Sequence, residues 1–281
     1  MSVRPGMAPE SGYLSRLMHL IGVSLAQLVR TPTHSRRAEA RRRWARRLLG
    51  ISALAAMVIV ALMFAVDAYE IGLMPPRGSA GLWPVKLISD FGKSEYVMLA
   101  LLALLILLAL AAPRLRGMSQ AVLISFGTRI QYILLSVAFS VLVGEILKGV
   151  VGRGRPFVGG SANAFHFSHF AWTEAYASFP SGHATTSFAL AFAVSALWPR
   201  LRSAMFAYAI VIIATRLVLL AHHPSDVVGG ALTGVIGAMA VRYWFAARHL
   251  AFTIRSDGAI EPLAGPSPRH LKRVAREAFA P

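Results

Sequence analysis

An uninterrupted apolar run restricts the fold of this chain more than any other feature. Residues 98–112 read MLALLALLILLALAA and contain neither a charged nor a polar side chain. Such a segment is stable in the hydrocarbon core of a bilayer, which about 20 helical residues cross. Comparable apolar segments predict six transmembrane helices, over residues 49–69, 96–113, 128–148, 183–199, 203–221 and 226–246. The expected fold is therefore all-α, a polytopic membrane protein with the six helices in a bundle.

The composition of the chain agrees with a membrane protein. Of its 281 residues, 56% are hydrophobic and only 15% are charged, whereas soluble domains carry about 25% charged residues. With 29 basic and 12 acidic residues the net charge is +17, which in a soluble chain would suggest a nucleic-acid partner. Here the cations flank apolar segments, so we expect them to meet membrane lipids and expect no nucleic acid. The absence of Cys excludes disulfides and thiolate chemistry.

The positions of the basic residues predict which connections face the cytoplasm. Ten Arg precede residue 48, and four more lie in the short connections 113–127 and 198–203. Because cytoplasmic loops carry the excess of Lys and Arg, both termini and these two connections are placed on the cytoplasmic side, with a bacterial inner membrane as the expected location. The connections that face outward, to the periplasm or exterior, are then 70–95, 149–182 and 222–225.

The chain divides into three parts on this view. Residues 1–48 form a basic cytoplasmic segment, in which the apolar residues of 13–29 recur at helical spacing. That stretch is either an interfacial helix lying on the membrane or an ordinary amphipathic helix before the first span. Residues 49–247 form the six-span domain. Residues 248–281 form a basic cytoplasmic tail, which we expect to be loosely ordered.

Polar residues gather at the outward edge of the predicted spans. Ionisable groups in such places are costly and mark functional sites. They come from four different spans or loops, yet the topology places all of them at one membrane face. The set comprises Glu145, Lys148, Arg153, Arg155, Ser181, His183, Arg216, His222, His223 and Asp226.

Three cations of this set predict an anionic ligand. Lys148, Arg155 and Arg216 would lie in a nearly dry location and need compensating negative charge. The two carboxylates of the set, Glu145 and Asp226, leave a positive surplus. A phosphate group supplies several acceptor oxygens and up to two charges, and the planar guanidinium of Arg matches those oxygens in a bidentate manner.

The start of the fourth predicted span adds an anion-binding element. Ser181 suits the N-cap of that helix, and Gly182 allows the backbone to approach a ligand closely. A helix N-terminus presents free N–H groups and positive potential to an anion. Simple helix capping would explain Ser181 and Gly182, but it would leave His183 unexplained.

The turn between the last two spans predicts a nucleophile. Pro224 disfavours helical geometry at His223, so the fifth helix should end near His222, while Ser225 caps the sixth. His222 and Asp226 on either side of this turn can hydrogen-bond, and a carboxylate that holds one imidazole nitrogen leaves the other free to attack. Alternatively, Asp226 is only a first-turn helix charge and His222 an interfacial residue.

Four further polar residues have assignments outside the three motifs. Glu145 precedes Lys148 by one helical turn and can pair with it. Arg153 either reaches the phosphate or occupies the surface. His166 and His169 lie in an aromatic stretch of the connection 149–182, and they either touch substrate or rest in the headgroup region.

Three ordered motifs resemble the signature of the type 2 phosphatidic acid phosphatase superfamily. The resemblance spans residues 148–226, and the six-span layout extends it over about 49–246. The third motif of that superfamily usually begins Ser-Arg, whereas this chain has Thr215. The motifs are Lys148-x6-Arg155-Pro156, Pro180-Ser181-Gly182-His183 and Thr215-Arg216-x5-His222-x3-Asp226.

The resemblance implies a role for each motif residue. His222 attacks phosphorus and forms a phosphohistidine, with Asp226 orienting its ring. His183 protonates the leaving alcohol, and water then releases phosphate. The residues that hold the phosphate are Lys148, Arg155, Ser181, Gly182 and Arg216.

The expected function is hydrolysis of a lipid phosphate or diphosphate by an integral membrane phosphatase. No cofactor and no metal are expected, because cations and helix-terminal amides can stabilise the transition-state charge and the sequence has no carboxylate-rich cluster. A phosphotransferase would use the same phosphohistidine and pass the phosphate to another lipid. A transporter or a structural membrane protein is the alternative from another class, and it would instead show a charge near the bilayer centre or broken helices. Phosphatidic acid, phosphatidylglycerol phosphate, undecaprenyl diphosphate and lipid A all remain candidate substrates.

Overall fold

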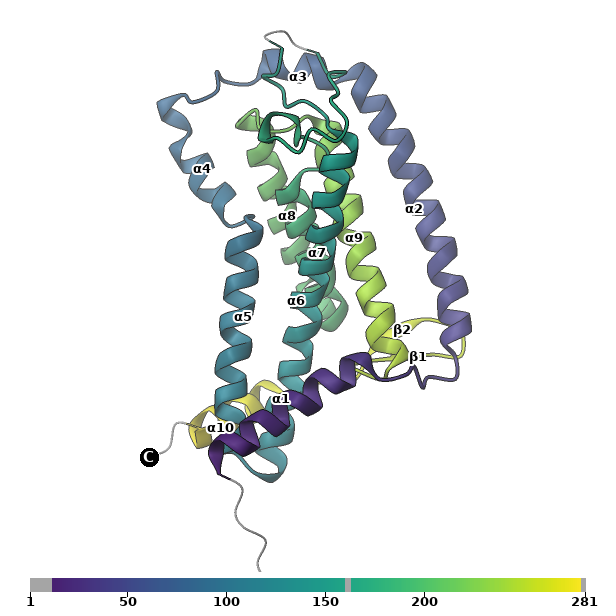
Figure 1. The fold of residues 1–281 in the computed structure, drawn as a ribbon, viewed down its shortest axis with the longest axis vertical. Helices are drawn as coiled ribbons and strands as arrows, with labels where there is room; N and C mark the ends of the chain where they lie inside the picture. The colour runs from purple at the N-terminus through teal and green to yellow at the C-terminus, as the bar shows by residue number, and fades with distance from the viewer. Residues whose placement is uncertain (1–11, 160–162, 279–281) are drawn as a thin grey trace, which may run out of the picture.

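The computed structural model describes residues 12–159 and 163–278. The first eleven residues of the predicted N-terminal segment 1–48 and the last three of the tail 248–281 lie outside them. The chain is helical almost throughout (Figure 1). The helices are α1 (Tyr13–Val29), α2 (Arg37–Ala65), α3 (Asp67–Leu73), α4 (Trp83–Asp90), α5 (Ser94–Ala111), α6 (Gly117–Val151), α7 (Gly182–Leu197), α8 (Arg202–Val218), α9 (Pro224–Ala247) and α10 (Pro268–Ala278).

Five helical stretches of the described residues are long and apolar enough to cross a membrane. The 18-residue apolar segment of each stretch has a mean hydropathy between 1.3 and 2.6. They are Arg37–Ala65, Ala80–Arg114, Gly117–Val151, Pro199–Val218 and Pro224–Ala247. Five of the six predicted spans are thereby confirmed. The remaining one corresponds to α7, an apolar helix of 16 residues.

Helix α7 lies at the centre of the bundle, in contact with α6, α8 and α9. Small residues let the helices approach closely, and Ala184, Ala189, Ala191 and Ala193 of α7 are fully buried. In Figure 1, α2 and α5 flank this group, α3 and the loop after α6 cover one end, and α1 and α10 lie at the other. The bundle thus has a loop-covered end and an end closed by terminal helices.

Residues 248–278 of the tail are largely folded, so the expectation of a loosely ordered segment is wrong for this part of the tail. Strands β1 (Phe252–Ile254) and β2 (Ile260–Pro262) form an antiparallel hairpin. Phe252 is buried, with its ring 4.8 Å from that of Tyr132 in α6, and Val274 of α10 is buried as well. These apolar side chains anchor a basic segment that composition alone marks as solvent-exposed.

Helix α1 lies across the end of the bundle opposite the long loops (Figure 1). Its backbone accepts a hydrogen bond from Trp244 Nε1 at Leu28, 3.0 Å long, and Gln131 of α6 donates to Ser24 Oγ at 2.7 Å. Leu14 and Met18 remain exposed on its outer face. The stretch 13–29 is therefore an apolar helix attached to the bundle by few polar contacts.

Candidate active site

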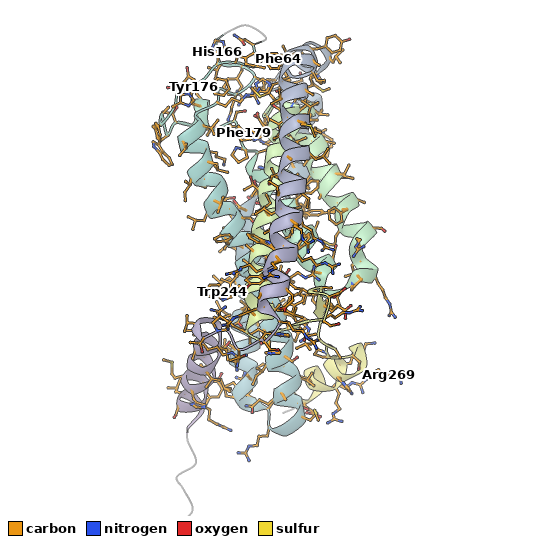
Figure 2. All side chains as sticks on the ribbon, turned by 90° about the vertical axis from the view of Figure 1, so that its right-hand side faces the viewer. Phe64, His166, Tyr176, Phe179, Trp244 and Arg269 are labelled. Atoms are coloured by element: carbon orange, nitrogen blue, oxygen red, sulfur yellow. The ribbon has the colours of Figure 1, made fainter. Side chains whose placement is uncertain are left out.

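A cavity of about 170 Å³ opens near the loop-covered end of the bundle. Helices α5, α6, α7 and α8 form its walls, and the turn before α9 contributes one side chain. Figure 2 shows Phe64, His166, Tyr176 and Phe179 at this end of the molecule, with Trp244 and Arg269 toward the other. Six of the eight predicted site residues line the cavity: Lys148, Arg155, Gly182, His183, Arg216 and His222.

The three predicted cations all reach this cavity from different elements. Lys148 Nζ in α6 lies 2.5 Å from Glu145 Oε1, as expected for residues one turn apart. Arg155 Nε in the following loop donates to the Glu174 carbonyl at 3.0 Å. Arg216 Nη1 at the end of α8 donates to Ser89 Oγ at 2.8 Å. Two carboxylates, Glu95 and Glu145, line the cavity together with the three cations, so the formal charges of its lining leave a positive surplus.

The start of α7 faces these cations. A side chain at Gly182 would place its Cβ 3.1 Å from Lys148 Nζ, so glycine leaves room for the ammonium group beside the helix N-terminus. Ser181 occupies the N-cap position but makes no capping hydrogen bond, and its buried Oγ has no hydrogen-bond partner among the described residues. The predicted capping bond is therefore absent, and this hydroxyl is available to a phosphate oxygen.

His222 is held by a backbone carbonyl. Its Nδ1 lies 2.8 Å from the Ser178 oxygen, and since a carbonyl can only accept, Nδ1 carries the proton and Nε2 is the free nitrogen. Burial, together with the charges of Arg216 and Arg155, holds the pKa of His222 well below its ordinary value. The imidazole is therefore neutral at pH 7, as a nucleophile must be.

Asp226 does not bond directly to His222, contrary to the simplest expectation. Its Oδ2 is 4.0 Å from His222 Nδ1. The same oxygen accepts hydrogen bonds from Ser178 Oγ at 2.5 Å and from the His223 backbone N–H at 2.9 Å. Asp226 thus contacts the residue that holds His222, and it caps the first turn of α9.

Arg153 is neither a surface residue nor a phosphate ligand, so both alternatives considered for it are wrong. Its side chain is 1% exposed and does not line the cavity. Its Nη1 lies 2.6 Å from Asp226 Oδ1, and its Nη2 lies 2.8 Å from Asp67 Oδ2. The motif carboxylate and a second buried carboxylate therefore share one guanidinium.

Asp67 was missed because no motif contains it. It lies near the end of the first predicted span, 49–69, and is one of only four Asp in the chain. A charge at the end of a membrane span, on the side where the other polar residues gather, was the available signal.

Glu70, one turn after Asp67, is buried without a partner. It is 5% exposed, and both carboxylate oxygens lack a hydrogen-bond partner among the described residues. Burial first, and then the charge of Asp67, raises the pKa of Glu70 to about 7. Glu70 is thus a buried carboxyl group whose charge changes near neutral pH.

Replacing Glu70 with glutamine is expected to stabilise the protein at pH 8 and to have little effect at pH 5. Between the ordinary pKa of 4.5 and about 7 the folded state binds more protons than the unfolded state, so wild-type stability falls as pH rises through that window. The glutamine side chain of the variant carries no charge to bury. Thermal unfolding in detergent at both pH values measures the effect, with the exposed Glu277→Gln as control. Equal shifts at pH 5 and pH 8 would contradict the assignment.

Three other predicted residues lie outside the cavity. His169 Nδ1 bonds to the Val151 carbonyl at 2.8 Å, and neither His166 nor His169 lines the cavity. Thr215 replaces the usual Ser of the third motif. Its hydroxyl donates a hydrogen bond to the Ile212 carbonyl of the same helix at 2.6 Å. No group of three His, Asp or Glu placed to hold a metal occurs within residues 12–159 and 163–278.

Comparison with known proteins identifies the family of this chain. The sequence model of the PAP2 superfamily matches residues 129–250. A Rhizobium johnstonii protein named lipid A 1-phosphatase is 33% identical over 227 residues, which cover 77% of this chain and 92% of that protein. A Rhizobium etli protein of the same name is 34% identical over 177 residues, covering 62% of this chain and 75% of its own. No solved structure shows a significant match.

The chain therefore belongs to the PAP2 superfamily and is a lipid phosphate phosphatase of that family. The family resemblance and the hydrolase class inferred from the three motifs are confirmed.

Proposed function

We propose that this chain hydrolyses the phosphate of a lipid A-type lipid at the outer face of a bacterial inner membrane, through a phosphohistidine on His222. The observation that carries the proposal is the convergence of three cations, a helix N-terminus and a neutral imidazole on one cavity. The names of the two Rhizobium relatives support lipid A as the substrate class.

The phosphate group occupies the cavity with its oxygens toward the cations. Lys148, Arg155 and Arg216 bind these oxygens, and the Gly182 amide and Ser181 hydroxyl at the start of α7 add donors. The charge that develops on phosphorus-bound oxygens in the transition state is stabilised by these preorganised groups. These groups stabilise the negative charge of the transition state without any further ligand.

The chemical steps use two histidines. His222 Nε2 attacks phosphorus and forms an N–P bond while the bond to the lipid oxygen breaks. His183, which the negative charge of the bound phosphate keeps protonated in the complex, gives its proton to that oxygen. Neutral His183 then accepts a proton from water as the water oxygen attacks phosphorus. The N–P bond breaks, inorganic phosphate leaves, and both histidines return to their starting states. Asp226 orients His222 through Ser178 during both steps.

Helix α7 completes the six spans in this proposal. Its 16 residues extend about 24 Å, and neighbouring helices shield it on several sides. With residues 49–247 spanning the membrane six times, both termini lie in the cytoplasm and the cavity faces outward. The five long spans alone would place the termini on opposite sides.

This topology predicts a labelling pattern for single cysteines in the Cys-free chain. Arg77, in the connection between α3 and α4, and Ser256, in the turn between β1 and β2, are both exposed and lie outside the membrane-crossing stretches. A membrane-impermeant thiol reagent on intact spheroplasts is expected to label Arg77→Cys and spare Ser256→Cys. Lysed cells, in which both should react, are the control. The reverse pattern would contradict the outward-facing cavity.

Phosphate release from a lipid panel tests the activity itself. Purified protein in detergent with EDTA is expected to release phosphate from lipid A without an added acceptor, and to act more slowly on phosphatidic acid and undecaprenyl diphosphate. A product that forms only when an acceptor lipid is added would identify a phosphotransferase instead. Loss of activity with EDTA and its return with Mg²⁺ would contradict the role given to the cations.

A further inference from the structure

We propose that Asp67 is a positioning residue for His222, acting through Arg153, Asp226 and Ser178. Asp67 begins α3 and lies outside residues 129–250, which match the family. The inference rests on the proposed role of His222 as nucleophile.

Asp67 contacts two parts of the site at once. It is 0% exposed. Its Oδ2 accepts a hydrogen bond from Arg153 Nη2 at 2.8 Å, and its Oδ1 accepts one from the Ser225 backbone N–H at 3.0 Å. The Ser225 hydroxyl donates to Asp67 and accepts from Arg153 Nη1. One carboxylate therefore fixes both a guanidinium and the first turn of α9.

The guanidinium of Arg153 has an acceptor for each of its five N–H groups. Nε and Nη2 donate to the Ala164 carbonyl at 3.1 and 2.9 Å, and Nη2 also donates to Asp67. Nη1 donates to Ser225 Oγ and to Asp226 Oδ1, each at 2.6 Å. The five donors of the guanidinium have a rigid planar arrangement. Loss of the Asp67 acceptor therefore leaves a buried donor unpaired and removes the contact that fixes Nη2 of Arg153.

Two contacts connect the orientation of the Arg153 guanidinium to His222 through Ser178. Asp226 accepts from Ser178 Oγ at 2.5 Å, and the Arg153 carbonyl accepts from the Ser178 N–H at 3.0 Å. Ser178 in turn holds His222 Nδ1 at 2.8 Å with its own carbonyl. A shift of Arg153 therefore moves Ser178 through both side chain and backbone, and the imidazole follows.

A purely structural role for Asp67, as an anchor between the end of α2 and α9, makes a different prediction. Such an anchor changes how much protein is folded but not the rate of each folded enzyme. Asp67→Asn keeps a similar volume and leaves Arg153 and Asp226 as a balanced ion pair, so the variant is suited to separate the two roles.

A single-turnover measurement separates the two roles. Folded enzyme is used in excess over lipid A that is labelled at its phosphate, so the measured rate constant does not depend on the folded fraction. Asp67→Asn is expected to lower that rate constant by about 10- to 100-fold, because small misplacements of reacting groups have effects of that size. The matched control Asp257→Asn removes an exposed carboxylate paired with Arg43 near the opposite end and is expected to stay within about twofold. An unchanged rate constant for Asp67→Asn with a reduced folded yield would overturn the proposal.

Ser225→Ala offers a milder second variant without loss of charge. It removes the hydroxyl between Asp67 and Arg153, and it is expected to slow the same step by a smaller factor.

Nitrogen NMR of histidine-labelled protein tests the inference without activity. His222 is expected to carry its proton on Nδ1 in wild type and to populate both tautomers in Asp67→Asn. Identical His222 signals in the two proteins would overturn the positioning role. If instead wild type and Asp257→Asn release no phosphate from any lipid of the panel, the proposed function fails, and the NMR result still decides the role of Asp67.

A second, independent observation points to a lipid site at the opposite end of the bundle. A cavity between α7, α8, α9 and β2 is lined by Arg202, Arg242 and Ser195 as polar groups and by Phe192 and Phe206 as apolar ones. Arg242 Nε and Ser195 Oγ are buried atoms with no hydrogen-bond partner among the described residues. Glu261 also lines it, but its carboxylate pairs with Arg255 at 2.8 Å.

We infer that this cavity binds an anionic phospholipid of the cytoplasmic leaflet. Two guanidinium groups face the phosphodiester of the headgroup, and the aromatic side chains contact an acyl chain. Basic pockets between transmembrane helices on the cytoplasmic side recognise anionic headgroups in this way. In the proposed topology Arg202 lies at that membrane surface.

Native mass spectrometry with phosphatidylglycerol and phosphatidylcholine tests this site. Arg202→Gln is expected to weaken phosphatidylglycerol binding about fivefold, whereas Arg200→Gln, an exposed neighbour that does not line the cavity, should leave it unchanged. Equal losses in both variants, or equal binding of the two lipids to wild type, would overturn the inference. Inorganic phosphate should not compete, because it lacks the acyl chains.

Discussion

Replacing His222 with alanine is expected to abolish phosphate release, with a fall in turnover on the order of 10⁴-fold or more, as for the loss of other nucleophiles. The imidazole Nε2 is the group that forms the bond to phosphorus, and His183, the other imidazole that lines the described cavity, is assigned to proton transfer. The side chain is removed from a turn, so the helices around it remain packed.

Phosphate release and acid-labile phosphoenzyme formation measure this effect together. His169→Ala is the matched control, because His169 lies near the same end but bonds to the Val151 carbonyl outside the cavity. Turnover of His222→Ala within tenfold of wild type, in protein that unfolds at the wild-type temperature, would contradict the mechanism.

Replacing His183 with glutamine is expected to slow the hydrolysis of a lipid phosphate by about 10²- to 10⁴-fold, the usual contribution of a general acid. His183 lines the cavity at the start of α7, where its Nε2 is buried without a hydrogen-bond partner among the described residues. The lost step is protonation of the alcohol oxygen that leaves phosphorus.

The leaving group distinguishes this role from simple phosphate binding. p-Nitrophenyl phosphate releases a weakly basic phenolate that needs no proton, so His183→Gln should slow its cleavage far less than that of a lipid phosphate. Arg216→Gln is the control, because a lost phosphate ligand should slow both substrates alike. An equal loss on both substrates for His183→Gln would assign His183 to binding.

Membrane topology explains why much of the site could be predicted from the sequence. Spans of similar length can place their ends only at two surfaces, so Lys148, Arg216 and His222 had to meet if each lies at the outward end of its span. The structure brings these three to one cavity. The apolar runs likewise predicted the long helices, because a single segment satisfies all of its own backbone hydrogen bonds in lipid only as a helix.

The contacts that hold the catalytic residues in position could not be predicted in the same way. Asp67 and Arg153 are 86 positions apart, and no periodic pattern relates residues on separate helices. The Ser178 carbonyl that holds His222 is a backbone group, which residue identity does not reveal. Helix boundaries also differ: α2 begins at Arg37, well before the apolar segment at 49, because Ala, Arg and Glu favour helix even outside the membrane.

The size of the catalytic cavity has a consequence for how the enzyme meets its substrate. About 170 Å³ is well below the roughly 300–1,000 Å³ of pockets that enclose a whole ligand. The acyl chains are therefore expected to stay among neighbouring lipids while the headgroup alone enters the cavity. The relevant concentration is then the mole fraction of substrate in the surrounding two-dimensional film, so inert lipid or detergent should dilute the substrate and slow the reaction at constant bulk concentration.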